Sequence, residues 1–482
     1  MGIGATFQIG QAGLKIYQVA TEVVSENIAN VNTEGYSRQR VILETAPPTN
    51  HNGFPLGTGV KISAVERYYD GLLQQQLVNA DSASGHDSLK SQVLSQIEPA
   101  FNEIANDGIG ASITNFFDAW QDLTLNPSGI PERQAVLTQG QILADTFHTV
   151  STSLTDAQSA QDVSLTTVTA DVSATLKDIA QLNGQIKTTE LVSGNANELR
   201  DRRDLLVRNL SEQVGITYTE NADGTTDVKA LGGQALVTGD TYATMYTSVV
   251  VPATTNSVFV TAVGNPPAAT NPATDTNITA TVGGANNSKG EIGALLELRD
   301  TTIPYYLGKV NTLAAQIVSD VNALHVSTGG RPTYDLNGAA GGAFFDAAGT
   351  TAASINLDAN VLGVGGTSKI AASLTTSRGD NSNALALAKL ANTTDATLGA
   401  TFSSYYDSLV SEVGLAVKST ENQASQSEAF VNQLTNLRES NSGVSLDEEL
   451  TTLLQYQRSY QASAKLITTA TEMLDIALGM VG

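Results

Sequence analysis

Residue types that commonly carry chemistry are few in this chain, and they do not form a recognisable site. The 482 residues include no cysteine, which excludes disulfides, thiolate metal ligands and a cysteine nucleophile. The four histidines are His51, His86, His148 and His325, and no two of them have the spacing of metal ligands. We expect His325, at the end of a strongly apolar helix, to pack or cap rather than to bind a ligand. The sequence therefore predicts neither a metal nor a cofactor.

One group of carboxylates could supply acid–base chemistry. Cleavage of a glycosidic bond needs two carboxyl groups that flank the bond, and Glu98, Glu103, Asp107 and Asp118 include candidates for such a pair. However, the chain carries 48 acidic and 25 basic residues, a formal charge of −23, so scattered carboxylates are expected throughout. We interpret these four as part of a solvated acidic face, and a peptidoglycan-cleaving enzyme is a remote alternative.

Arginines gather on one predicted helix of this acidic chain. Acidic residues lie between them at helical spacing, which predicts an ion-paired helix face. A contact with another subunit is the second interpretation. The residues are Arg200, Arg202, Arg203 and Arg208, with Glu198, Asp201 and Asp204.

The acidic charge also limits the partners. Nucleic acids and anionic membrane surfaces both attract basic proteins, so we expect neither as a partner. No apolar run approaches the roughly 20 residues of a membrane-spanning helix. The first 20 residues lack the basic start and the continuous apolar stretch of a signal peptide. If the protein acts outside the cell, it must leave by another route.

Long amphipathic helices are predicted at both chain ends, because residues spaced alternately four and three apart are mostly apolar. The N-terminal seam consists of Ile3, Phe7, Gly10, Leu14, Tyr17, Thr21, Val24, Ile28 and Val31. The C-terminal seam consists of Leu446, Leu450, Leu453, Gln457, Tyr460, Ala464, Ile467, Thr471, Leu474 and Leu478. Such helices are marginal in water when isolated. Each needs the other terminus, another subunit, or both as a partner, and the spacing leaves this choice open.

The start of the last helix is clearly marked. Ser445 is a candidate N-cap, and Glu448, three residues further on, completes the pattern of a capping box. Asp447, Glu448 and Glu449 also match the positive end of a helix dipole.

Breaks in the helical pattern divide the chain, and we predict a mainly α fold with long terminal coiled-coil helices and a helical-bundle body with a small inserted β domain. Prolines and glycines in residues 36–66 predict an extended loop or hairpin, and Asp223-Gly224 predicts a hairpin turn. The predicted parts are a terminal helical domain of residues 1–70 and 432–482, a helical body of 71–215, 289–328 and 377–431, a β domain of 216–288, and an irregular or β-rich segment of 329–376.

Two stretches at the chain ends identify a family. Residues 27–38, Asn-Ile-Ala-Asn-Val-Asn-Thr-Glu-Gly-Tyr-Ser-Arg, resemble the N-terminal signature of flagellar rod, hook and hook-associated proteins, and residues 443–465 resemble their C-terminal signature. The residues to which we assign the match are Asn27, Asn30, Asn32, Gly35, Tyr36, Asp447, Glu448 and Glu449. Inside the chain, residues 197–206, 289–300 and 379–385 are similar to the hook-associated branch. A hook or distal rod protein, the alternative within this family, should lack the stretch 289–300.

The resemblance implies a structural role and not an enzyme: a subunit of the bacterial flagellum at the junction between hook and filament, polymerising through its terminal helices. It implies that these helices line the inner tube of an axial polymer and that the β domain faces outward. The implied partners are further copies in a ring or helical layer, hook protein on one side, and a second hook-associated protein or the filament on the other.

The resemblance also implies how the protein reaches its place. It would be exported unfolded through the flagellar type III channel, without a cleaved signal peptide, and would be extracellular. A cytoplasmic chaperone would hold the C-terminal helix before export. Terminal helices without a partner would be disordered or chaperone-bound in the monomer and would fold on assembly.

Overall fold

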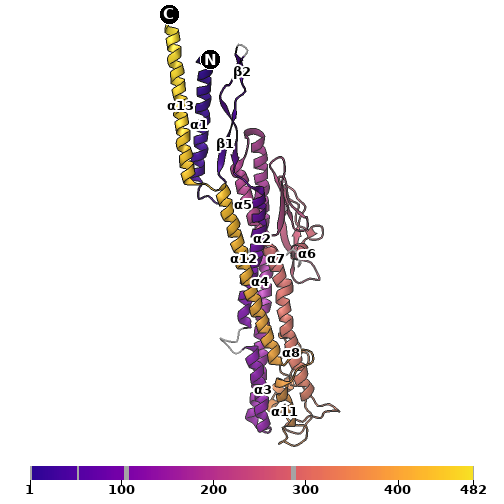
Figure 1. The fold of residues 1–482 in the computed structure, drawn as a ribbon. Helices are drawn as coiled ribbons and strands as arrows, with labels where there is room; N and C mark the ends of the chain where they lie inside the picture. The colour runs from indigo at the N-terminus through magenta and orange to yellow at the C-terminus, as the bar shows by residue number, and fades with distance from the viewer. Residues whose placement is uncertain (1–2, 52–53, 102–107, 284–288, 481–482) are drawn as a thin grey trace.

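The computed structural model describes residues 3–51, 54–101, 108–283 and 289–480. It shows an elongated molecule whose helices run mostly along its long axis, with both chain ends at the same end (Figure 1). The mainly helical fold class with a small β insertion is confirmed.

The two terminal helices pair with each other. Helix α1 (Ile3–Ala29) runs from the free end toward the middle of the molecule, and α13 (Leu446–Gly479) returns beside it (Figure 1). Residues 36–66 form the predicted hairpin: β1 (Gln39–Thr45) pairs antiparallel with β4 (Val60–Arg67), and β2 (Thr49–His51) pairs with β3 (Phe54–Leu56) near its tip. The strands β1 and β4 also contact α1, which therefore lies between α13 and the hairpin.

A set of long helices, here called the body, follows. Helix α2 begins at Gly71 because the carboxylate of Asp70 accepts hydrogen bonds from the backbone N–H groups of Leu72 and Leu73, at 3.0 and 3.1 Å. The 64 residues of α4 form one continuous helix roughly 95 Å long. The body helices are α2 (Gly71–Ile97), α3 (Ile109–Leu125), α4 (Ile130–Ser193), α5 (Asn197–Gln213), α7 (Gly290–Glu297), α8 (Ile303–His325), α11 (Ser382–Lys389) and α12 (Phe402–Ser442), with short turns η1 (Glu98–Ala100), η2 (Leu298–Thr302, π-helical) and η3 (Leu390–Asn392).

The β domain packs on the upper half of α4. One antiparallel sheet has the order β5-β6-β7-β8, and a second has the order β11-β10-β9. The predicted hairpin turn at Asp223-Gly224 joins β5 to β6, and Gly224 has a positive φ of 81°. The elements are β5 (Ile216–Glu220), β6 (Thr226–Ala230), β7 (Ala235–Thr238), β8 (Thr241–Tyr242), β9 (Met245–Val249), β10 (Asn256–Val260), β11 (Thr276–Asn277) and α6 (Thr279–Val282).

Residues 329–376 are irregular, and all of them are described. They form isolated bridges, such as Phe345 with Leu357, and the one-turn helices α9 (Ala359–Leu362) and α10 (Gly366–Lys369), but no strand. The β-rich part of that expectation is therefore wrong. The segment is held by burial instead, because Phe344 and Phe345 insert into the core.

His325 packs this segment against α8, as the sequence predicts. Its Nδ1 donates to the carbonyl oxygen of Gly342 at 2.7 Å, and its Nε2 accepts from the backbone N–H of Ala371 at 2.8 Å. Complete burial lowers the pKa of His325 to about 4, so the imidazole is neutral at physiological pH.

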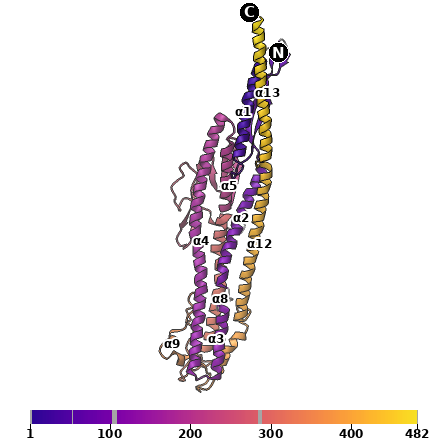
Figure 2. The same ribbon diagram turned by 90° about the vertical axis from the view of Figure 1, so that its left-hand side faces the viewer.

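Buried apolar residues form two large clusters along the body. The lower core, far from the chain ends, joins α3, the first half of α4, α8, α11 and the start of α12 around aromatic residues such as Trp120 and Phe147. The upper core joins the second half of α4, α5, α7 and the β domain around residues such as Leu176 and Leu210. Helix α4 runs through both halves, and α12 lies along the opposite side of the body (Figure 2).

Candidate assembly site at the terminal helices

Small residues allow α1 and α13 to approach closely. A Cβ atom at Gly10 would lie 2.7 Å from Cγ1 of Ile467, and one at Gly13 would lie 2.6 Å from Oγ of Ser463. Further along, the rings of Tyr17 and Tyr456 are in contact, with centroids 6.2 Å apart. The separation of packed helices is set by the side chains between them, so this interface is a close one.

The face of α13 that packs on α1 is not the seam predicted from the sequence. Every seventh residue faces α1: Glu449, Tyr456, Ser463 and Ala470, of which all but Tyr456 are fully buried. The predicted seam lies one residue further along, which turns it by about 100° around the helix.

Most of the predicted C-terminal seam therefore faces away from α1. Leu450 is 49% exposed and Leu478 is 64% exposed, and Leu446, Tyr460 and Leu474 are also exposed. Leu453, Ala464 and Ile467 are half-buried. The exposed seam residues and Leu454 lie on one side of the helix, which we call the outer face of α13: Leu446, Leu450, Leu454, Tyr460, Leu474 and Leu478. Several exposed large apolar residues on one side of a helix are typical of an interaction site.

The predicted N-terminal seam is more enclosed. Val24 is buried, Phe7 is exposed, and the side chain of Ile3 lies outside the described residues. The remaining predicted interface residues, all half-buried, are Leu14, Tyr17, Ile28 and Val31.

A buried polar cluster joins the base of α1 to the start of α13. Asn27 donates from Nδ2 to Oε2 of Glu449 at 3.0 Å and to the carbonyl oxygen of Gln39 at 2.9 Å. Its Oδ1 accepts from the backbone N–H of Gln39 and from the hydroxyl of Tyr36, both at 2.9 Å. Burial, the largest cause, and nearby carboxylates raise the pKa of Tyr36, so its hydroxyl keeps its proton. We call Asn27, Tyr36, Arg38, Gln39 and Glu449 the polar joint.

Arg38 connects three chain segments in this joint. Its Nε lies 2.5 Å from Oε1 of Glu449 and its Nη1 lies 2.7 Å from Oε2 of Glu448, while its backbone N–H donates to the carbonyl oxygen of Ser442 at 2.8 Å. Burial alone would lower the pKa of Arg38, but Glu449 and Glu448 outweigh it and raise the pKa. The predicted capping box is not formed: Ser445 is the N-cap residue but its side chain makes no capping bond, and Glu448 pairs with Arg38 instead.

A second group of ion pairs lies beneath the joint. Arg67, on β4, lies 2.7 Å from Asp201 and 2.8 Å from Asp204 of α5. Arg438, near the end of α12, donates to the carbonyl oxygen of Gly35 at 2.6 Å. These residues line a cavity of about 20 Å³, enough for one water molecule, so the site is a contact between segments and not a ligand pocket.

Most of the family-motif residues meet in or beside this joint. Gly35 has a positive φ of 81° and lies against Leu205 of α5. Asn30 accepts from the hydroxyl of Thr33 at 3.0 Å, whereas Asn32, in the turn after α1, and Asp447, in the first helical turn of α13, are exposed. No sequence pattern pointed to Arg67 or Arg438, because their partners are far away in the chain.

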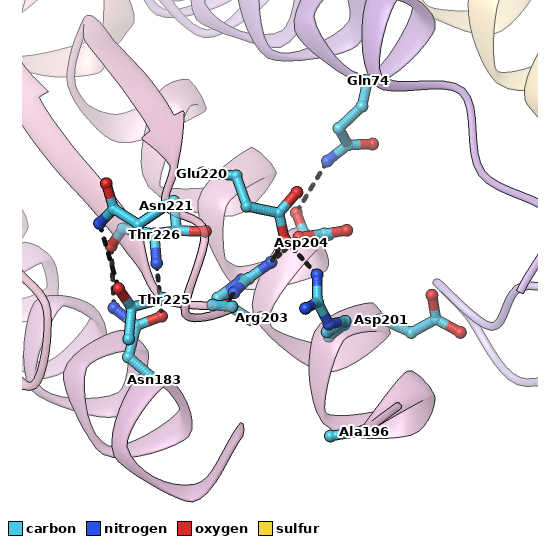
Figure 3. Close-up of polar contacts among 12 residues, drawn as sticks. Gln74, Asn183, Ala196, Asp201, Arg203, Asp204, Glu220, Asn221, Thr225 and Thr226 are labelled. Carbon is cyan, nitrogen blue, oxygen red and sulfur yellow. Dashed lines mark hydrogen bonds and ion pairs between the residues drawn. The ribbon is translucent and has the colours of Figure 1, made fainter. Parts of the chain in front are cut away.

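The arginines of α5 form ion pairs and hydrogen bonds with the β domain and with neighbouring helices. Arg203 donates to the carbonyl oxygen of Gly224 at 2.5 Å and lies 3.1 Å from Glu220 (Figure 3). Arg200 pairs with Glu190 of α4 and Glu220 of β5, and Arg208 pairs with Asp81 of α2. Arg200, Arg203 and Arg208 are thus ion-paired, but the predicted pairing along the face of α5 is mostly wrong: the contact of Arg203 with Asp204 at 3.3 Å lies within α5, and the other partners lie on other elements.

The carboxylates considered for hydrolysis do not form a described site. Asp118 is exposed on α3 and Glu98 is half-buried after α2, while Glu103 and Asp107 lie outside the described residues. Within the described ranges, no helix is apolar over enough of its length to cross a membrane.

Comparison with known families matches three parts of the chain. Residues 94–345 match the model "Flagellar hook-associated protein FlgK helical domain". Residues 7–36 match "Flagella basal body rod protein", and residues 438–480 match "Flagellar basal body rod FlgEFG protein C-terminal".

Individual relatives agree along nearly the whole length. Flagellar hook-associated protein 1 of Bacillus subtilis is 30% identical, with 98% of each chain covered, and that of Salmonella typhimurium is 26% identical, with 97% of this chain and 98% of the relative covered. The structure of the flagellar hook junction protein FlgK from Burkholderia pseudomallei is similar in fold, with a TM-score of 0.66 at 17% identity, and covers 76% of this chain and all of that one.

The chain thus combines paired helices from its two ends with end segments that match rod-protein families. These features define it as an axial protein of the bacterial flagellum. The chain belongs to the flagellar hook-associated protein 1 (FlgK) family and is a structural flagellar component.

Substitution of Gly10 tests the close packing of α1 on α13. Gly10→Val should weaken the pairing by about 1–3 kcal/mol, because the added methyl groups overlap Ile467. Gly4→Val is the matched control, since a Cβ at Gly4 has no atom within 4 Å. Hydrogen exchange of the α13 amides measures the difference, and equal protection in both variants would contradict the packing.

Two adjacent glutamates give a second test. Glu449→Ala should destabilise the terminal helices by about 1.5–3 kcal/mol, because a buried charged partner of Arg38 and Asn27 is lost. Glu448→Ala, which removes a carboxylate whose side chain is 65% exposed compared with 2% for Glu449, should cost below about 1 kcal/mol. Hydrogen exchange in α1 and α13 reports both, and a larger effect of Glu448→Ala would refute the joint.

Proposed function

We propose that this protein is a subunit of the junction between hook and filament and that it polymerises through its terminal helices. The observation that carries the proposal is the outer face of α13, a row of exposed leucines and other apolar residues at the end of the molecule where both termini meet. Its inner face is already occupied by α1, so a second partner is needed to cover the outer face.

Charge supports a second copy as that partner. The chain carries a formal charge of −23, so copies repel each other except where their contact surfaces are nearly uncharged. From Leu466 to Met480 only Glu472 and Asp475 are charged. The outer face of one copy would contact a different surface of the next, a heterologous arrangement that builds rings or helical layers.

The parts of the chain take different places in this proposal. Residues 1–70 and 432–482 form the inner tube, and residues 71–215, 289–328 and 377–431 form the body around it. The β domain, residues 216–288, faces outward, and residues 329–376 close the far end of the body. The polar joint would then set the angle between inner tube and body.

Membership of the family supports the proposed neighbours and export route. Hook protein lies on one side, and a second hook-associated protein or the filament lies on the other. Before assembly the outer face of α13 would be an aggregation risk, which supports a cytoplasmic chaperone at this helix. Export through the flagellar type III channel, without a cleaved signal peptide, brings the protein to its extracellular site.

A hook or distal rod protein is the alternative in the same family. The matches at both chain ends are to rod-protein families and do not separate these classes. The match over residues 94–345 is to the helical domain of FlgK and favours the junction. No catalytic role is part of the proposal, and release of peptidoglycan fragments by the purified protein would contradict it.

Deletion of the gene tests the role directly. Electron microscopy should show intact hooks without filaments, with unpolymerised flagellin in the medium. Missing hooks would point to the hook or rod alternative, and normal flagella in a strain with a single copy would refute the proposal.

Complementation of that strain tests the outer face. A variant with Leu450→Asp and Leu474→Asp should be exported but should restore few or no filaments, because two charges would be buried between copies. The control, Leu191→Asp with Val192→Asp, changes aliphatic residues on α4 that are even more exposed and should restore filaments. Circular dichroism of both purified variants checks folding. Normal filament numbers with the first variant would exclude the outer face as the interface.

A further inference from the structure

A polar layer separates the lower and upper cores of the body. On α4 the lower core ends at Leu154 and the upper core begins at Leu165. Where α7 meets η2, Leu296 belongs to the upper core and Leu298 to the lower one, with Glu297 between them. On each of these elements the change of core coincides with polar residues.

The other two helices change in the same way. On α2, Val78 belongs to the upper core and Val93 to the lower one, with His86 between them. On α12, Val417 belongs to the lower core and Leu434 to a small cluster nearer the termini, with Ser427 between them.

Contacts between these polar residues show that they form one layer. Arg299 of η2 lies 2.6 Å from Asp162 of α4, and Gln158 of α4 donates to the carbonyl oxygen of Arg299 at 2.8 Å. Glu297, two residues before Arg299, contacts α2. The layer thus runs from α4 through α7 to α2.

His86 lies at the centre of the contact with α7. Its Nδ1 is 3.1 Å from Oδ1 of Asp87, and its Nε2 is 3.0 Å from Oε2 of Glu297. Carboxylates only accept hydrogen bonds, so both ring nitrogens must donate, and only the imidazolium form does this. A neutral ring would place a lone pair against one carboxylate in a buried position.

The charges around His86 balance when it is protonated. Asp87 and Glu297 face the ring, and Lys90 lies 2.5 Å from the other oxygen of Glu297. Helix α12 contributes uncharged groups: Ser427 donates to Oδ2 of Asp87 at 2.5 Å, and the amide of Gln423 also binds Asp87.

The neighbouring helix α5 adds no carboxylate contact with the ring. It approaches α2 through Glu212, whose backbone carbonyl and Cγ atom both lie against Gly85. The charges that act on the Glu212 carboxylate are those of Asp81 and Arg208. Loss of the His86 proton would leave two carboxylates and one ammonium in the contact.

The ionisation of the three groups is consistent with this geometry. Burial would lower the pKa of His86, but the bonds to Asp87 and Glu297 outweigh it and raise the pKa above the usual value. The bond to His86 is the largest cause that lowers the pKa of Glu297, to about 2. The pKa of Asp87 is also lowered, against the effect of burial, through His86 and Ser427.

We propose that the polar layer is a proton-dependent clasp, in which the doubly protonated ring of His86 holds α2 against α7 and, through Asp87, against α12. Because α12 leads directly into α13, the clasp also positions α13 relative to the body. His86 acts as a positioning residue. This inference rests on contacts within one chain and does not depend on the proposed function.

The sign of the pH dependence follows from linkage. A histidine whose pKa is higher in the folded than in the unfolded chain contributes its full stabilisation below about pH 6.5, the unfolded value. That contribution is lost as the pH rises through the folded pKa. The clasp therefore opens toward alkaline pH and stays closed under mildly acidic conditions.

Hydrogen exchange between pH 6 and pH 9 tests the clasp in the full chain. After correction for intrinsic exchange, opening of α12 around residues 423–431 should increase with pH in the wild type, about tenfold for each unit by which the folded pKa exceeds the unfolded one. His86→Gln should be open throughout and independent of pH. His148→Gln is the control, because His148 contacts the backbone carbonyl of Ile355 and no carboxylate, and it should follow the wild type. A wild type without pH dependence would overturn the proposal.

Nitrogen NMR of labelled histidine side chains gives a second readout that needs no destabilised variant. In the wild type the ring of His86 should still be mainly doubly protonated at pH 6.5, the midpoint of an unperturbed histidine, and should titrate above that pH. Asp87→Asn and Glu297→Gln should each lower that midpoint, which also assigns the signal. A His86 ring that is mainly neutral at pH 6.5 would refute the clasp, whatever the behaviour of the variants.

Discussion

The burial of one carboxylate determines how the terminal helices are placed. Glu449 lies at the start of α13 with almost no exposed side-chain surface, and it is bound by Arg38 and Asn27. A buried charge without partners is very costly, so α13 must present this residue to the base of α1. The contacts further along the pair are consistent with that rotation. It brings Ser463 and Ala470 toward α1 and leaves the leucines outside.

This constraint connects the polar joint to assembly. If hydrophobicity alone decided, the leucine-rich seam of α13 would be expected to cover α1. Glu449 and the glycines of α1 favour the opposite arrangement, with small residues inside and large apolar residues outside. Helix α13 can therefore pair stably with α1 within one chain and still present an apolar surface to further copies of the protein. The proposed polymer uses the face that the joint leaves free.

Glu449 and the residues around it also show which features could not be predicted from the sequence. Periodicity predicted where α1, α8 and α13 lie, because apolar spacing is a local signal, and the turn at Asp223-Gly224 predicted the β5–β6 hairpin. Periodicity placed the seam of α13 one residue away from the face that meets α1, since it does not register a buried charge such as Glu449. Arg67 and Arg438 gave no signal, because they act on partners more than 100 residues away. Among residues 329–376, Phe344 and Phe345 are held by distant packing rather than by a strand pattern.

Polar contacts at two positions along the molecule determine how its long helices are placed against each other. Apolar packing alone specifies helix register loosely, because hydrophobic cores tolerate alternative neighbours of similar size. Buried polar groups specify it more strictly, because a shift leaves them without partners, and a single buried polar residue is enough to fix register in coiled coils. The polar joint does this between α1 and α13, and the layer around His86 does it between the two cores of the body. The position of the terminal helices relative to the far end of the body thus depends on two small sets of hydrogen-bonded charges as well as on the apolar packing between them.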